Sequence, residues 1–427
     1  MRAKRGLLAG LALSVCAPLA AGETAGVAAP AGGPPGEPQG IARWFDPSTA
    51  PFVPVPEIDV DPNSGVTLGL IPTWLVTDDA GRIRDIFAPD VMYNPNFGFG
   101  ARGRVFAYPS DDTQWSVVGG AKERVESEFD FEFQTGRTRS GRWSFNASVV
   151  YDRSGTPRFY GIGNNSPAFA ETDYTEQQKY LQMTLGWNID RAWQIAYTVR
   201  DRSVEVQPGT LARIISLQAR FGRILGVGTN DELLNRVAIS FDTRDDVTIP
   251  KHGSEVAVYG GIASRDGVPD ASLYSVTGID ARHFWPVDSD ATVAAHFAMR
   301  YMPGTTRVPF WSLSSIGGDQ SVLGDSQPLR AFAQGRFYGR NSFSSSLEFR
   351  KRVLSIDAIS THIELELTPF VDVGEVFAHS RSSPVAELHK VAGIGFRGIA
   401  RPFVVGYVDI GYGSEGAAVF TGINYPF

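Results

Sequence analysis

Apolar and polar residues alternate with a period of two in segment after segment from residue 65 to the C-terminus. Trp143, Phe145 and Val149 share one face of such a segment. The residues next to them, Ser144 and Ser148, lie on the other face. Alternation of this kind predicts β-strands with one apolar and one polar face, and sustained helical periodicity is almost absent. The fold class is therefore expected to be all-β.

The alternating segments number sixteen and are separated by turn residues. All but one have about 10–16 residues, more than the ~5–6 usual in soluble sheets, and this length suits a tilted crossing of a bilayer. The expected strands are 65–76, 84–93, 97–108, 114–134, 142–154, 174–189, 192–206, 234–246, 253–265, 271–286, 290–303, 341–354, 363–377, 389–400, 402–413 and 417–427.

Connection lengths favour a membrane barrel. Short turns such as Asn94–Asn96 follow even-numbered strands, whereas the long connections all follow odd-numbered ones. The long connections are 155–173, 207–233, 304–340 and 378–388. Short periplasmic turns and long outer loops are typical of outer-membrane β-barrels. We therefore expect residues 65–427 to form an antiparallel transmembrane β-barrel with both termini in the periplasm.

The first 22 residues are predicted to be a secretory signal peptide, because Arg2, Lys4 and Arg5 precede an apolar run. Cys16 leaves open a second interpretation, in which a lipoprotein signal is acylated at that residue. Without the signal no cysteine remains, which excludes disulfides and thiol chemistry. The chain without the signal keeps 36 of the 39 basic residues and all 46 acidic ones. The resulting net charge of −10 argues against a nucleic-acid partner.

Residues 23–64 are rich in Pro, Gly and Ala, a composition typical of linkers. We expect them to form a periplasmic tether. Beyond the signal region no stretch approaches 18 consecutive apolar residues, so no transmembrane helix is expected.

The connection from Gly317 to Arg340 is too rich in Gly, Ser, Asp and Gln to be a strand. Loops longer than about 12–15 residues are uncommon and usually functional. This one contains several arginines and aromatic residues, so we expect it to fold back onto the rest of the protein.

Gly324, Asp325 and Ser326 superficially resemble a hydrolase nucleophile segment, but no pattern positions a base and an orienting acid around the serine. We therefore expect neither an enzyme nor a cofactor.

A cluster of carboxylates raises the question of a metal site. Glu364, Glu366 and Asp372 could hold a hard cation. Cross-strand ion pairs with Arg350 and Arg352 are the favoured alternative, with Arg352 opposite Glu364 and Arg350 opposite Glu366.

Four places in the chain resemble the BamA/TamA superfamily of outer-membrane assembly factors, also called the bacterial surface antigen family. Leu329, Arg330, Ala331 and Phe332 resemble its Val-Arg-Gly-Phe/Tyr motif, with Ala331 in place of the glycine. The other matches are Ser345–Arg350, which contains Glu348; Phe370–Gly374, which contains Asp372; and Phe241–Asp246 with Pro250–Gly253. The C-terminal Tyr425-Pro426-Phe427 is similar to the recognition signal of outer-membrane barrels.

The resemblance implies a closed sixteen-stranded barrel, with the loop between strands 11 and 12 folded into the lumen. It places Arg330 beside Glu348 and Asp372, and it puts Tyr425 and Phe427 on the lipid side. It further implies contact with outer-membrane lipid, insertion by the barrel assembly machinery, and a function in protein or lipid biogenesis or translocation. Residues 23–60 are too short for the POTRA domains of the family, so insertion activity is not implied directly, although a periplasmic partner is possible. The alternative is a porin-like passive channel.

Overall fold

The computed structural model describes residues 52–77, 83–264, 273–304, 307–358, 361–378, 387–400, 404–423 and 425–427. The expected signal peptide and residues 23–51 of the expected tether lie outside the described residues. Within the described part of the chain, no helix is both long and apolar enough to span a membrane.

The described residues form twenty-two strands and three short helical segments. The strands are β1 (Phe52–Asp61), β2 (Gly65–Thr77), β3 (Ile83–Phe87), β4 (Asp90–Asn94), β5 (Gly98–Ser110), β6 (Thr113–Lys122), β7 (Ser127–Thr135), β8 (Trp143–Ser154), β9 (Arg158–Phe159), β10 (Thr172–Asn188), β11 (Trp193–Pro208), β12 (Gly228–Asp242), β13 (Gly253–Ser264), β14 (Tyr274–Pro286), β15 (Ala291–Tyr301), β16 (Ser314–Ile316), β17 (Phe337–Gly339), β18 (Asn341–Ala358), β19 (Thr361–Phe377), β20 (His389–Ala400), β21 (Val404–Gly413) and β22 (Gly416–Ile423). The helical segments are η2 (Ala168–Ala170), α1 (Leu217–Phe221) and η3 (Phe310–Ser312).

All strands but β16 and β17 join one sheet, in which each pairing is antiparallel. β3 and β4 share one position between β2 and β5, and β9 continues β8 along β10. Twenty strands therefore occupy eighteen successive positions in the described sheet. The predicted all-β antiparallel fold is confirmed.

The predicted count of sixteen strands is wrong for two local reasons. Phe52–Asp61, expected in the tether, is strand β1 and pairs with β2 along its whole length. The segment 114–134, expected to be one strand, turns at residues 123–126 and forms β6 and β7. Each missed strand reverses the direction predicted for every strand after it, so the two errors together leave the predicted directions correct after residue 142. The long connections therefore still lie at one end of the sheet. Between residues 65 and 122 the predicted directions are inverted, which places the Asn94–Asn96 turn at the end of the long connections.

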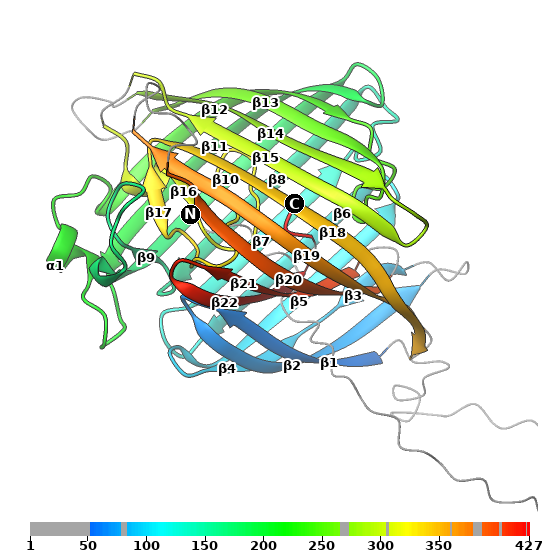
Figure 1. Cartoon of the computed structure of the whole chain (residues 1–427), viewed down its shortest axis with the longest axis horizontal. Coiled ribbons are helices and arrows are strands. Elements are labelled where there is room, and N and C mark those ends of the chain that lie inside the picture. Colours follow the sequence, from blue (N-terminus) through cyan, green and yellow to red (C-terminus); the bar gives the residue numbers. More distant parts are fainter. Residues whose placement is uncertain are drawn as a thin grey trace, which may run out of the picture.

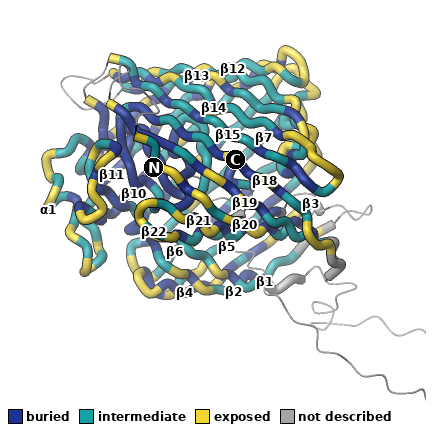
Figure 2. Tube along the Cα trace, viewed as in Figure 1, coloured by how far each residue is buried: buried dark blue, intermediate teal, exposed yellow. Residues whose placement is uncertain are grey.

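The two faces of the sheet differ as the alternation predicted. On β18, Leu347 and Phe349 are exposed at 47% and 41%, whereas Ser346, Glu348 and Arg350 are buried. Buried residues gather where the long connections meet (Figure 2). The sheet therefore carries an apolar outer face and a polar, buried inner face.

The sheet curves round until its two edge strands, β1 and β22, lie side by side (Figure 1). The Val60 backbone N–H donates to the Thr421 hydroxyl at 2.8 Å, and that hydroxyl donates to Asp59 at 3.3 Å. Among the described residues no backbone ladder joins β1 to β22. The two edges meet through side-chain hydrogen bonds.

Candidate functional site

The connection between β15 and β18 is an ordered loop that enters the interior of the curved sheet. β16 and β17 pair with each other at its root. Further in, Gly318 pairs with Leu329, and the Phe332 N–H donates to the Leu329 carbonyl at 3.0 Å to close a tight turn. Gly317 has a φ of 120°, and a Cβ there would lie 2.3 Å from the Ala333 carbonyl. The turn that presents Arg330 therefore depends on backbone geometry within the loop.

Arg330 lies at the tip of this loop and is fully buried. Its Nε and Nη2 donate to the two oxygens of Asp372 at 2.9 and 2.7 Å, and its backbone N–H donates to Asp372 at 3.0 Å. Its Nη1 donates to Glu348, and also to Asp409 at 3.1 Å. The guanidinium carbon lies 3.6 Å above the Phe370 ring. A planar, five-donor group matches this arrangement, and a lysine could not reproduce it.

The charges around Arg330 are balanced. Arg350 donates to Glu348 at 2.8 Å, and Arg397 donates to Asp409 at 3.1 Å. Burial by itself would lower the pKa of Arg330, but Asp372 and Glu348 outweigh burial and raise that pKa well above its ordinary value. Because a buried charge left without a partner is costly, each member of this cluster stabilises the others in place.

The structure brings Arg330, Glu348 and Asp372 together, as the sequence motifs suggested. Asp409 on β21 belongs to the same cluster and was missed. It shares one face of β21 with the buried Val405 and Tyr407, so a carboxylate in line with two larger, mostly apolar side chains was the available signal.

The other motif residues anchor the loop through apolar contacts. Leu329, Ala331 and Phe332 pack in a buried cluster with Ile316, Phe337, Phe370, Val376 and Val391. Within the described ranges, the non-glycine residues with positive φ are Val125 and Arg139. Ala331 is not among them, so an alanine is compatible with this position of the motif.

The hairpin of β18 and β19 differs from the predicted register. Arg352 lies opposite Glu366, and a bulge follows at Val353. Its ion pair with Glu364, at 2.5 Å, runs diagonally. The predicted pair of Arg350 with Glu366 is wrong, since Arg350 donates to Glu348 on its own strand. No group of three potential metal-binding side chains occurs among the described residues.

The prediction that Tyr425 and Phe427 face lipid is also wrong. β22 ends at Ile423, and Pro426, which lacks an N–H, cannot continue the ladder. Phe427 is 5% exposed and stacks on His296 from β15. The C-terminal residues therefore lie on the inner face, where Figure 1 marks the C-terminus among the strands.

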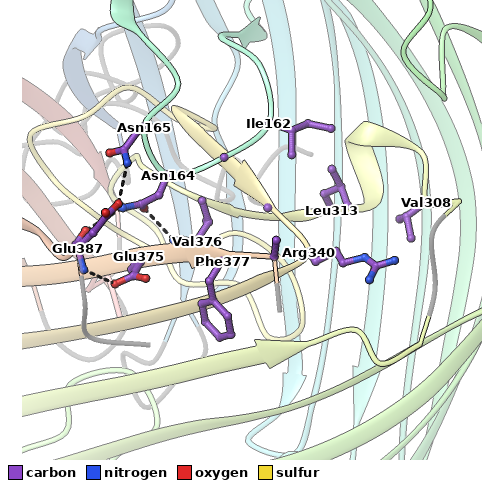
Figure 3. A pocket seen from close by; sticks show the side chains of 13 residues that line it. Ile162, Asn164, Asn165, Val308, Leu313, Arg340, Glu375, Val376, Phe377 and Glu387 are labelled. Atoms are coloured by element: carbon purple, nitrogen blue, oxygen red, sulfur yellow. Dashed lines mark hydrogen bonds between the residues drawn. The ribbon is translucent and has the colours of Figure 1, made fainter. Parts of the chain in front are cut away.

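At the end with the long connections, the segment between β8 and β10 covers the root of the loop. Arg336 donates to the Ser166 carbonyl at 2.8 Å and pairs with Glu415 at 2.5 Å. A cavity of about 630 Å³ lies beside this contact. Figure 3 shows Glu375 and Glu387 at one end of the cavity and the Arg340 side chain at the other.

His296, Asp280 and Ser321 lie together but are not arranged as a catalytic triad. Asp280 and Ser321 both approach the same ring atom, Nε2, at 3.2 and 3.4 Å. A triad needs the acid on one ring nitrogen and the nucleophile on the other. Ser326, the residue noted in the sequence, follows a turn closed by the Asp325 N–H and the Val322 carbonyl. Neither arrangement supplies an activated nucleophile.

Comparison with known proteins supports this architecture. The model of the Omp85 superfamily domain matches residues 114–397. Solved structures similar to this chain include BamA from Haemophilus ducreyi lacking POTRA domains 1–3, at 12% identity and a TM-score of 0.50, which covers 87% of this chain and 74% of that one. CdiB from Escherichia coli is similar at 12% identity and a TM-score of 0.46, covering 86% of this chain and 61% of that one. No curated protein matches the sequence.

Proposed function

The chain belongs to the Omp85 superfamily, and on this basis we propose that its interior loop, held by Arg330, serves the assembly or translocation of other molecules across the outer membrane. The protein is an outer-membrane β-barrel of the assembly and translocation type. The substrate of this activity would be a protein or a lipid that the barrel inserts or secretes.

The observation that carries the proposal is the contact of Arg330 with three carboxylates on three strands, β18, β19 and β21. This contact supports a loop that stays within a closed barrel of eighteen positions. We propose Leu329, Arg330, Ala331 and Phe332 as the functional motif, with Glu348 and Asp372 as its partners. Outer-membrane lipid would surround the apolar face, and a periplasmic partner would be recruited through residues 23–51.

A porin-like passive channel is not favoured, because the interior holds both the loop and the C-terminal residues. Conductance in planar bilayers distinguishes the two functions. An assembly factor of this design should give a small, flickering conductance. A large and steady open pore would favour the channel.

Activity can be tested in proteoliposomes. Vesicles that contain the protein should accelerate the folding of a urea-denatured outer-membrane barrel relative to empty vesicles and to vesicles with the Arg330→Ala variant. Equal folding rates in all three would contradict assembly of protein substrates.

A further inference from the structure

The C-terminal tripeptide occupies a built site on the inner face. Tyr425, Pro426 and Phe427 follow the end of β22, and each of them has a separate partner in the interior. Side chains on the inner face and the backbone of the loop both contact these three residues, so the tail has a defined position.

Phe427 fits a slot between β14 and β15. Its ring stacks on that of His296 with centroids 5.0 Å apart and planes inclined by 17°. Phe284 and Ala294 complete the slot, and both are fully buried or nearly so. Near-parallel stacking in a buried slot selects a flat aromatic ring at this position.

Tyr425 fits a second slot. The guanidinium carbon of Arg350 lies 3.8 Å above its ring, which is a cation–π distance. Its hydroxyl donates to Glu366 at 3.3 Å. Apolar contacts with Ile249, Ile399 and Val405 surround the rest of the ring. An aromatic ring with a hydroxyl fits both ends of this slot.

Pro426 connects the tail to the loop. Its carbonyl accepts a hydrogen bond from the Ser321 backbone N–H at 2.9 Å. Ser321 lies in the same connection as Arg330, between β16 and β17. The tail and the interior loop are therefore in direct contact.

Arg350 provides a second connection. It stacks on Tyr425 and donates to Glu348, and Glu348 also accepts from Arg330. Removing Tyr425 would take one partner from Arg350, and removing Arg330 would take one partner from Glu348. Because buried charges depend on all their partners, the two contacts should support each other.

We propose that the interior contains a binding site for an aromatic-Pro-aromatic peptide, that the chain's own C-terminus is its ligand, and that its occupation locks the loop. Arg350 is a positioning residue that couples the tail to Arg330. The coupling is reciprocal, so releasing the loop should also release the tail.

A prolyl carboxypeptidase, which removes an apolar C-terminal residue that follows a proline, reports release of the tail. In the purified full chain, removal of Phe427 should be slow, and it should be at least about fivefold faster in Arg350→Gln and His296→Leu, in the range typical of coupled sites. The loop variant Arg330→Gln should accelerate it as well. Arg191→Gln, in the exposed turn between β10 and β11, is the control and should match the parent. Equal rates in all variants would overturn the proposal.

A second experiment tests the site in trans. In the Tyr425→Ala/Phe427→Ala double variant, trypsin should cleave the loop after Arg336 faster than in the parent. Added Tyr-Pro-Phe should restore slow cleavage, and Ala-Pro-Ala should not. A rate of cleavage that changes neither with the double substitution nor with the added peptide would contradict the site. Neither readout measures assembly activity, so failure here is distinguishable from failure of the proposed function.

Discussion

A Cβ atom on Gly411 of β21 would lie 1.8 Å from the carbonyl oxygen of Arg330. The loop tip thus rests against the sheet at a point where only a hydrogen atom fits. This contact places Arg330 within reach of Asp372, Glu348 and Asp409.

Gly411→Ala should therefore displace the loop tip, because the clash is with backbone and cannot be relieved by rotating a side chain. We expect faster trypsin cleavage after Arg336 while heat-modifiable migration on a gel is kept. Gly103→Ala on β5 is the control, since a Cβ there would meet its nearest atom at 3.9 Å. Parent-like cleavage of Gly411→Ala would show that the tip does not rest on β21.

Arg330→Lys should loosen the loop almost as much as Arg330→Ala. An ammonium group cannot make the forked contact with Asp372 and also reach Glu348 and Asp409. Breaking a buried pair by removing one partner costs about 3–5 kcal/mol, and water in the interior would reduce this cost. Noisier or larger conductance in planar bilayers is the measurement. If the lysine variant conducts like the parent, charge alone holds the loop.

The ion pair of Arg352 with Glu364 should contribute much less. Both lie near the short-turn end of the sheet, and the Arg352 side chain is 30% exposed. Partly exposed pairs typically contribute about 0.2–1 kcal/mol. Arg352→Ala should leave the thermal midpoint within a few degrees of the parent. A large fall would mean that the bulge at Val353 depends on this pair.

The tethering of the loop should weaken as pH rises. Asp319 in the loop has its pKa raised to about 7, chiefly by burial, although a hydrogen bond from Tyr407 opposes the shift. The native state therefore retains a proton that the unfolded state has lost. This contribution to stability is complete below about pH 4 and is lost as the pH rises to about 7, above which both states are ionised. Trypsin cleavage of the loop, corrected for the enzyme's own pH profile, should rise between about pH 5 and 7 and level off above pH 7, and Asp319→Asn should remove the rise.

Alternation along the strands predicted the fold class, the faces and most strand ends. On β18 and β19, Leu347, Phe349 and Val371 are exposed, whereas Ser346, Glu348 and Asp372 are buried, as the alternation predicts. The period of two is imposed by the pleat, so local sequence was sufficient there.

The errors arose where local sequence is ambiguous. Phe52–Asp61 contains two prolines and reads as linker, but it lies at an edge of the sheet, where a strand tolerates proline. The turn at residues 123–126 has no Gly or Pro to mark it, so β6 and β7 read as one strand.

The site was predicted in part because its motif residues are distinctive. Asp409, Arg397 and Gly411 lie on β20 and β21, and they meet Arg330 only after the sheet curves round. The inward turn of Tyr425 and Phe427 likewise depends on partners on distant strands, so sequence spacing could not reveal it.

Disulfide crosslinking in whole cells tests the central claim, that the loop stays inside the barrel on β21. A Cβ on Gly413 would lie 3.0 Å from the Ala331 Cβ, and Cys16 in the predicted signal peptide is the single natural cysteine. The Ala331→Cys/Gly413→Cys variant should therefore form an intramolecular disulfide upon mild oxidation, seen as a mobility shift that reductant reverses, while the Ala331→Cys/Gly103→Cys control should not. A folded, heat-modifiable barrel in which the first pair stays reduced would contradict the account.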